Sequence, residues 1–284
     1  MIKNIDRLAN LEKSINGEKQ LTILSVELDG KDLDRLYDAL DIVPEYNRVK
    51  NIYNMAIENG NDLYRNIKLS CDVNYLDQNK VESNDIVMSV NKSIFNYCSS
   101  IGMYIDIIEK SLSKIDKIKM DSFRKECNYL YDNKLEYRFF VIMRNYILHY
   151  DLPFTVHERT ENSSKVKCLR EHLLKFKSWK HVKKDIENMD EEIDIISMIK
   201  QMNVSLTILL LQYQYLISKN VIDSWEIATK FMKKYGVSNP YIIKDYSIEY
   251  YKKGNLEIKP LGLDRLQSIV KELMNHPKIS ITTR

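Results

Sequence analysis

The stretch that decides the fold is Leu135–His149, with the sequence LEYRFFVIMRNYILH. A helix formed by these residues carries apolar side chains on nearly every side, which is typical of a helix at the centre of a bundle. Pro153 ends the pattern, because the residue before a proline avoids the helical region. The stretch therefore predicts a buried central helix that ends near His149.

Further helices are predicted on both sides of this one. Apolar residues recur at helical spacing over residues 85–118, which indicates one long amphipathic helix. Asp121 is expected to cap the next helix, which Asp132 and Asn133 end. The chain of 284 residues has only 7 Gly and 5 Pro, which favours long helices over sheets. We therefore expect a predominantly all-α fold, an antiparallel helical bundle.

One or two small β-hairpins are expected to be inserted in this bundle. Residues 154–170 alternate apolar and polar side chains around a polar turn, which predicts a hairpin directly after the central helix. Residues 246–258 predict a second hairpin, ahead of a closing helix at 263–274. A weaker alternation indicates a short strand at 21–28.

Three consecutive segments are expected along the chain. Residues 1–84 form an N-terminal helical extension, in which Pro44 and the Asn-Gly pair at 59–60 break the helices. Residues 85–220 form the helical bundle and end with a long helix at 193–218. Residues 221–284 form a C-terminal extension with a short helix at 224–235, a hairpin and the closing helix.

Composition excludes several classes of protein. The formal charge is only +3, from 43 basic and 40 acidic residues, so a polyanionic partner would have to bind a local cluster. The 4 cysteines have no metal-type spacing, which favours reduced thiols over a disulfide framework or a zinc site. Residues 1–12 lack the apolar stretch of a secretory signal, and the most apolar window, 204–217, is too short to span a bilayer. We expect a cytoplasmic protein with no metal and no cofactor.

Arg144, Asn145 and His149 are the polar residues of the central helix that suggest chemistry. A guanidinium is costly in so apolar a helix unless it has a partner or a ligand. In a structural interpretation, Arg144 pairs with an acid such as Glu136, and His149 bonds a carbonyl at the helix end. In a catalytic interpretation, the guanidinium binds a phosphate and the imidazole transfers protons near neutral pH. A step of five residues turns through about 140° beyond a full turn, so Arg144 and His149 do not share one face.

The segment Arg144-Asn-Tyr-Ile-Leu-His149 resembles the signature of the HEPN superfamily, an Arg followed by four to six residues and a His, often with Asn after the Arg. The resemblance covers about residues 85–220 and includes the position of the motif late in a bundle helix. It implies a dimer in which two motifs form a composite cleft that cuts RNA without a metal ion. It further implies that Arg144 stabilises charge on the phosphate, that His149 acts as general acid or base, and that Asn145 orients them.

A basic segment follows the motif over residues 165–184. Such clusters neutralise phosphates, and interleaved aromatic rings stack on bases, so we expect RNA to contact Lys175, Lys177, Trp179 and Lys180. In the alternative interpretation the segment is a solvated helix face whose Trp179 packs inward. The acidic run at 185–194 is expected to be a solvated helix start rather than a metal site.

Taken together, the sequence predicts an endoribonuclease that acts as a homodimer and attacks RNA through the substrate's own 2′-hydroxyl group. By resemblance it would belong to a toxin or anti-phage defence system and could have an antitoxin or inhibitory partner. One alternative is a non-catalytic HEPN bundle that binds a protein or a nucleic acid and regulates it. Another is a purely structural scaffold.

Overall fold

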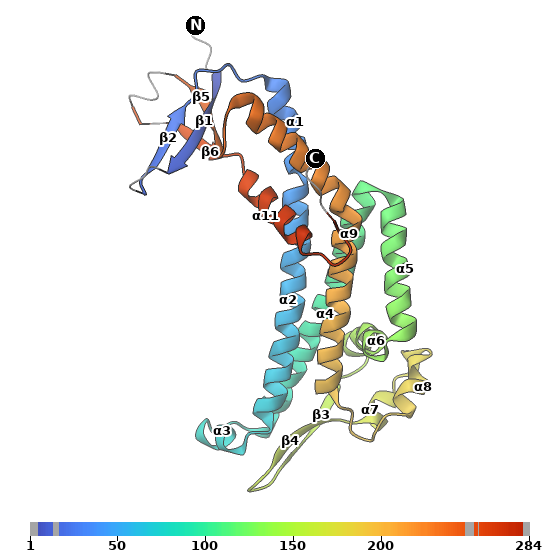
Figure 1. Cartoon of the computed structure of the whole chain (residues 1–284). Coiled ribbons are helices and arrows are strands. Elements are labelled where there is room, and N and C mark those ends of the chain that lie inside the picture. The colour runs from blue at the N-terminus through green and yellow to red at the C-terminus, as the bar shows by residue number, and fades with distance from the viewer. Residues whose placement is uncertain (1–4, 14–16, 248–252, 255, 281–284) are drawn as a thin grey trace. The chain divides into compact units, whose positions relative to one another are not determined.

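A computed structural model describes residues 5–13, 17–247, 253–254 and 256–280 (Figure 1). The helices are α1 (Gly30–Leu40), α2 (Ile42–Ser70), α3 (Val73–Gln78), α4 (Ser83–Ile115), α5 (Lys117–Asn133), α6 (Leu135–His149), α7 (Arg170–Leu174), η1 (Lys177–Trp179), α8 (Val182–Glu187), α9 (Ile195–Tyr235) and α11 (Leu263–Met274). The strands are β1 (Ile5–Lys13), β2 (Lys19–Ile23), β3 (Phe154–Arg159), β4 (Ser164–Cys168), β5 (Pro240–Tyr246) and β6 (Glu257–Pro260). The prediction of a predominantly helical fold with small antiparallel sheets is confirmed.

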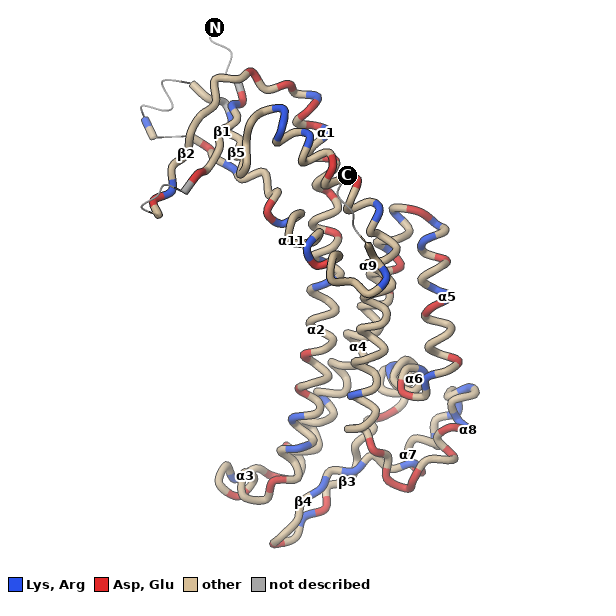
Figure 2. Tube along the Cα trace, viewed as in Figure 1, with Lys and Arg blue, Asp and Glu red and all other residues tan. Residues whose placement is uncertain are grey.

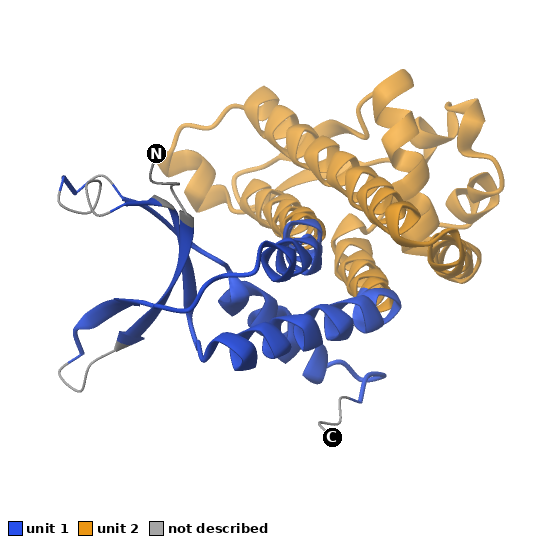
Figure 3. Ribbon diagram, turned by 90° about the horizontal axis from the view of Figure 1, so that it is seen from above, with its two compact units in different colours: residues 1–47, 214–284 blue, residues 48–213 orange. Residues whose placement is uncertain are grey.

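The chain divides into two compact units (Figure 3). Residues 1–47 and 214–284 form the first unit, and residues 48–213 form the second. This division differs from the three consecutive segments that the sequence suggested. The reason is that strands from the two ends of the chain pair with each other.

The second unit is built around α4 and α6, at the positions that the sequence predicted. The ring of Tyr97 on α4 packs edge-on against Phe140 on α6, with 5.1 Å between the ring centroids. The hydroxyl of Tyr97 donates to Oδ1 of Asn203 on α9 over 2.8 Å. Both rings are fully buried, so aromatic packing and this hydrogen bond join three helices in one core.

Helix α2 runs through the two positions that were expected to break it. Pro44 lies in its first turn, where a missing N–H removes no helical hydrogen bond. Gly60 lies at a close approach, because a Cβ atom there would be 2.8 Å from Cε2 of Tyr97 and 2.9 Å from Oδ1 of Asn203. The Asn-Gly pair is therefore a packing contact, and the prediction of a break at 59–60 is wrong.

Two further helix boundaries differ from the prediction. Helix α5 begins at Lys117, because Oδ1 of Asp116 accepts from the backbone N–H of Ile118 over 2.8 Å; Asp116, and not Asp121, is the N-cap. Helix α9 is continuous where two helices were expected, since residues 219–223 contain no Gly or Pro. Gly236, with φ of 66°, follows its end.

Helix α9 is longer than the apolar window from which the sequence excluded a membrane span. By length and composition alone it could cross a membrane. Core helices have the same character, and the side chains of Met202, Leu206, Leu209 and Ile217 have no exposed surface. Core packing accounts for the apolar composition of these positions.

The hairpin after the central helix is confirmed as β3 and β4, which pair antiparallel with Glu158 opposite Lys165. Asn91 of α4, only 2% exposed, fixes the start of the hairpin. Its Nδ2 donates to the carbonyl of Phe154 over 2.7 Å, and its Oδ1 accepts from the N–H of Phe154 over 3.1 Å. The chain that leaves α6 is thereby held on α4.

The first unit contains a four-stranded antiparallel sheet in the order β2-β1-β5-β6. Leu8 of β1 lies opposite Ile242 of β5, and both side chains are buried. The N-terminal extension is therefore not wholly helical, which corrects the prediction for residues 1–84. Strand β1 lacks the alternation of a half-buried strand, and its strand partner comes from the other end of the chain.

The second predicted hairpin is found in part. Strand β5 pairs with β6, and Tyr241 lies opposite Pro260. The strand begins at Pro240, six residues earlier than expected, and residues 248–252 and 255 of the predicted hairpin lie outside the described residues. Helix α11 spans the predicted closing helix, residues 263–274.

Candidate functional site

Arg144 lies against the middle of α4, where Gly102 has no side chain. A Cβ atom at position 102 would lie 3.0 Å from Nε and 3.1 Å from Cδ of Arg144. Nε is buried without a hydrogen-bond partner, and among the described residues Arg144 forms no ion pair. Gly102 therefore lets a charged side chain lie along a helix that does not neutralise it.

Cys98 lies one helical turn before Gly102 and is only 2% exposed. Burial raises the pKa of its thiol, while the positive charge of Arg144 acts in the opposite direction. The thiol thus stays protonated at neutral pH and supplies no counter-charge. A guanidinium left without a partner in such surroundings favours an anionic ligand.

Asn145 and His149 are exposed and lie four residues apart, on the same face of α6. Within the described part of the chain, neither side chain forms a hydrogen bond or an ion pair. Glu136 is 6% exposed and accepts a hydrogen bond from Oγ of Ser205 over 3.4 Å, instead of pairing with Arg144. The structural roles that the sequence allowed for Arg144 and His149 are therefore not found among these residues.

Large apolar side chains are exposed on the two helices that carry Gly102 and the motif. Met88 and Phe95 of α4 are 52% and 42% exposed, and they precede Gly102 by 14 and 7 residues, at the spacing of one helix face. Leu148 and Tyr150, at the end of α6, are 44% and 48% exposed. These side chains on one face of α4 and at the end of α6 offer apolar surface to a second protein.

Trp179 belongs to the core, and the prediction that it contacts RNA is corrected. The side chain has no exposed surface, and its Nε1 donates to the carbonyl of Leu173 over 2.5 Å. Its ring stacks on Phe139 and Tyr146, with centroid distances of 5.9 and 5.6 Å. A nucleobase cannot reach it in this structure, so the inward-packed alternative holds for Trp179.

The aromatic cluster, Phe139, Tyr146, Tyr150, Phe176 and Trp179, attaches the segment after the hairpin to the motif helix. Tyr146 lies between Arg144 and His149 in the sequence but points into this cluster, where its hydroxyl is buried without a partner. Burial raises the pKa of that hydroxyl well above its usual value. Tyr146 thus fixes the rotation of α6, which turns Asn145 and His149 outward.

The lysines near the motif differ in whether an acid already pairs with them. Lys175, Lys177 and Lys180 are exposed, and in the described ranges none of them forms an ion pair. Lys165 and Lys167 pair with Glu192 and Glu158 over 2.6 and 2.5 Å. The three lysines predicted from the sequence therefore remain available to phosphates.

Arg138 fixes the basic segment to the motif helix. Its Nε and Nη2 donate to the carboxylate of Asp185 over 2.7 and 3.0 Å, in a bidentate pair between α6 and α8. Figure 2 shows the basic residues of α8 beside those of α6. The first residue of the predicted acidic run is thus a structural partner of Arg138.

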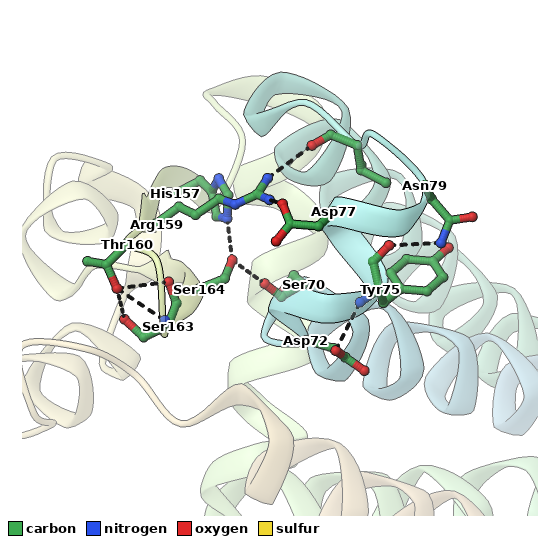
Figure 4. A network of polar contacts seen from close by, with 11 residues as sticks. Ser70, Asp72, Tyr75, Asp77, Asn79, His157, Arg159, Thr160, Ser163 and Ser164 are labelled. Atoms are coloured by element: carbon green, nitrogen blue, oxygen red, sulfur yellow. Dashed lines mark hydrogen bonds and ion pairs between the residues drawn. The ribbon is translucent and has the colours of Figure 1, made fainter.

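The hairpin is fixed at its other end by a polar network with α2 and α3 (Figure 4). Oγ of Ser164 donates to the carbonyl of Ser70 over 2.7 Å and lies 2.7 Å from Nε2 of His157. Arg159 forms an ion pair with Asp77 and donates to the carbonyl of Val81 over 3.3 Å. Because the serine proton is used by Ser70, His157 acts as a donor in this pair and not as a base for Ser164.

Three comparisons with known proteins provide no relative. The chain matches no protein-family model, no curated protein and no solved structure. Within residues 5–13, 17–247, 253–254 and 256–280, no three His, Cys, Asp or Glu side chains form a group that could hold a metal ion.

Gly102 and Tyr146 are the residues of this site that the sequence did not single out. A glycine in the interior of a long amphipathic helix is a signal of close approach, and Gly102 stands among the buried residues Cys98, Ser100, Ile101 and Tyr104. That signal names no partner, since Arg144 comes 42 residues later in the chain. Only the packing of α6 on α4 brings the two positions together.

Proposed function

We propose that the protein is an endoribonuclease that cleaves RNA without a metal ion, at a site formed by two copies of the chain. The observation that carries the proposal is the unpartnered guanidinium of Arg144 beside the exposed Asn145 and His149. These are the three residues of the segment that resembles the HEPN signature. The proposal includes an antiparallel HEPN-like bundle for α4 to α9 and a role in a toxin or phage-defence system.

The proposed chemistry is transesterification. The 2′-oxygen of the substrate forms a bond to the adjacent phosphorus atom as a histidine accepts the hydroxyl proton. The bond from phosphorus to the 5′-oxygen then breaks, and that oxygen takes a proton from a second histidine. The products are a 2′,3′-cyclic phosphate and a 5′-hydroxyl end. Arg144 stabilises the negative charge on the phosphate, and Asn145 orients the reacting groups.

Two copies of the chain supply the two histidines. One chain offers a single motif histidine, His149, whereas the reaction needs a base and an acid. The exposed apolar side chains Met88, Phe95, Leu148 and Tyr150 offer a surface for the second copy. Lys175, Lys177 and Lys180 then bind the RNA backbone on either side.

The test is cleavage of end-labelled single-stranded RNA by purified protein in EDTA, with analysis of the product ends. His149→Ala is the informative variant, because an exposed side chain without partners can be removed with little effect on folding. Arg65→Ala on α2, an exposed arginine paired only with Asp62, is the matched surface control.

We expect cyclic phosphate ends from the wild type and the control, and a loss of at least about a hundredfold in rate for His149→Ala. The melting temperatures of all three proteins should agree. Undiminished cleavage by both His149→Ala and Arg144→Lys contradicts the proposal. RNA binding by the wild type without any cleavage indicates a non-catalytic binding module instead.

A further inference from the structure

The first unit contains a cleft of about 720 Å³ that is separate from the motif on α6. Its walls come from the start of α2, from α9, from β5 and from the turn between β6 and α11. Clefts of several hundred Å³ that combine aromatic walls with a few free polar groups are typical of small-molecule sites. The cleft has both of these properties.

Two aromatic side chains, Trp225 of α9 and Tyr241 of β5, line the cleft, and both are half-buried. Half-buried rings expose part of their surface to the cleft and can stack on a planar group. Trp225 is one of the 2 tryptophans in the chain, and the other, Trp179, lies in the core of the second unit.

Three polar side chains of the cleft have no hydrogen-bonding partner in the part of the chain that the structure describes. Ser238, Asn239 and Arg265 line it, and in the described residues of the first unit none of their side chains forms a hydrogen bond or an ion pair. The side chain of Asn10, which is 4% exposed, fixes the backbone of Ser238 and Asn239 through hydrogen bonds. Its Oδ1 accepts from the N–H of Ser238 over 3.1 Å and from the N–H of Asn239 over 2.9 Å. The turn is thus fixed while its side chains stay free, as in a pre-formed site.

Arg265 lies in the first turn of α11, at the rim of the cleft. The N-cap of this helix is Gly262, with φ of 74°, so no cap side chain accepts hydrogen bonds from the first amides. A free guanidinium beside uncapped helical amides favours a phosphate group. Asp264, also in the lining, repels a second phosphate but accepts hydrogen bonds from hydroxyl groups.

We propose that this cleft binds a nucleoside monophosphate. The base stacks between Trp225 and Tyr241, and the phosphate lies at Arg265 and the start of α11. Asp264 accepts hydrogen bonds from the ribose, and Ser238 and Asn239 bond to the base edge. A bare anion leaves the aromatic walls unused, and an apolar ligand leaves the arginine unpaired, so this combined ligand fits the lining best.

The test is a fluorescence and calorimetric titration of the full-length protein with AMP, GMP, CMP and UMP. Stacking on Trp225 quenches its emission, while the buried Trp179 stays unchanged. Trp225→Phe should abolish the quenching and retain binding heat. Arg265→Ala should weaken binding of the preferred nucleotide about tenfold or more, and leave binding of its nucleoside unchanged. Lys271→Ala, a change of equal charge on the exposed last turn of α11, is the control and should bind like the wild type.

A free nucleotide and the 5′-phosphorylated end of an RNA chain share this chemistry. A mononucleotide and a 5′-phosphorylated trinucleotide are therefore titrated in parallel, and tighter binding of the trinucleotide assigns the RNA end. The absence of both quenching and heat with all four nucleotides overturns the proposal. Equal weakening by Arg265→Ala and Lys271→Ala also overturns it, since binding would then follow overall charge. Because the motif on α6 takes no part in this titration, the result is independent of RNA cleavage.

Discussion

Arg144 of α6 lies along α4 at Gly102, so closely that a Cβ atom at position 102 would be 3.0 Å from its Nε. The absence of one side chain on α4 thus determines where the charge of the motif lies. A substitution at Gly102 can therefore move the guanidinium of Arg144 while the arginine itself is kept.

Gly102→Ala should lower RNA cleavage without unfolding the protein. The added methyl group must push the guanidinium by a few tenths of an ångström, and small misplacements of a catalytic group cost roughly ten- to a hundredfold in rate. Alanine has the higher helix propensity, so the free energy of unfolding should stay the same or rise by up to about 1 kcal/mol. Cleavage assays and urea denaturation measure the two effects.

Gly60→Ala is the contrasting control for this substitution. Its Cβ would meet the ring of Tyr97 at 2.8 Å, and that ring is packed in the core. We expect a loss of about 1–3 kcal/mol in unfolding free energy. If Gly102→Ala lost stability in the same way and kept full cleavage per folded molecule, the positioning role of Gly102 would be refuted.

The parts of this fold that local signals specify were predictable from the sequence. Helices α6 and α11 match their predicted ranges, because the apolar pattern is dense in both and Pro153 supplies a clear stop after α6. Strand β1 was not predicted, because its neighbour β5 lies more than 200 residues away and pairing between distant segments leaves no local pattern. The same limit explains why two sequence segments at opposite ends form one unit.

The candidate site shows the same division. Arg144, Asn145 and His149 are adjacent in one helix, so a spacing rule found them. Trp179 was assigned to RNA because of its basic neighbours, whereas its contacts with Phe139 and Tyr146 decide its burial. Sequence composition shows which residues can stack on a base, but only packing shows which rings are accessible.

Formation of the proposed dimer should require the exposed apolar side chains of α4 and α6. We expect Phe95→Asp and Leu148→Asp to convert a dimer to a monomer and to abolish cleavage, because a carboxylate in an apolar contact is strongly unfavourable. Sedimentation velocity measures the oligomeric state. Ile118→Asp on α5, which changes a side chain that is 76% exposed, is the control. A wild-type monomer that cleaves RNA at full rate contradicts the composite site.

The three free lysines should determine the salt dependence of RNA binding. Replacing Lys175, Lys177 and Lys180 by alanine should lower the slope of log K against log salt by about 2, since each phosphate contact on single-stranded RNA contributes roughly 0.7. The matched control is the triple variant of Lys165, Lys167 and Lys183, which removes the same charge from lysines that acids already pair with. Equal slopes for the two triple variants would assign the effect to net charge alone.

Trp179→Ala should destabilise the protein by about 3–5 kcal/mol, because it removes a fully buried ring from the aromatic cluster. Trp179→Phe retains most of the volume and should cost less. Chemical denaturation followed by circular dichroism gives both values. If Trp179→Ala bound RNA more weakly while its stability was unchanged, the result would support a direct contact between the indole and the RNA.

His157 should make the hairpin sensitive to acid. Burial, and secondarily the charge of Arg159, lowers the pKa of His157 below its usual 6.5. Its Nε2 donates to Ser164, and its Nδ1 is buried without a partner, so the folded protein holds the neutral ring. Protonation would place a second, unpartnered N–H in this position beside the guanidinium of Arg159.

The sign of the effect follows from proton binding in the two states. Between pH 6.5 and the lower folded pKa, the unfolded chain binds more protons at position 157, so the free energy of unfolding falls as the pH falls. His157→Gln keeps a donor for Ser164 but has no titrating ring, and it should lose stability less steeply than the wild type between pH 7.5 and 5. Ser164→Ala removes the hydrogen bond while the ring remains, and it should lower stability at every pH. Thermal melts of the three proteins across this pH range measure these effects. If the melting temperatures of the wild type and His157→Gln fell in parallel with pH, His157 would be ruled out as the source of the acid sensitivity.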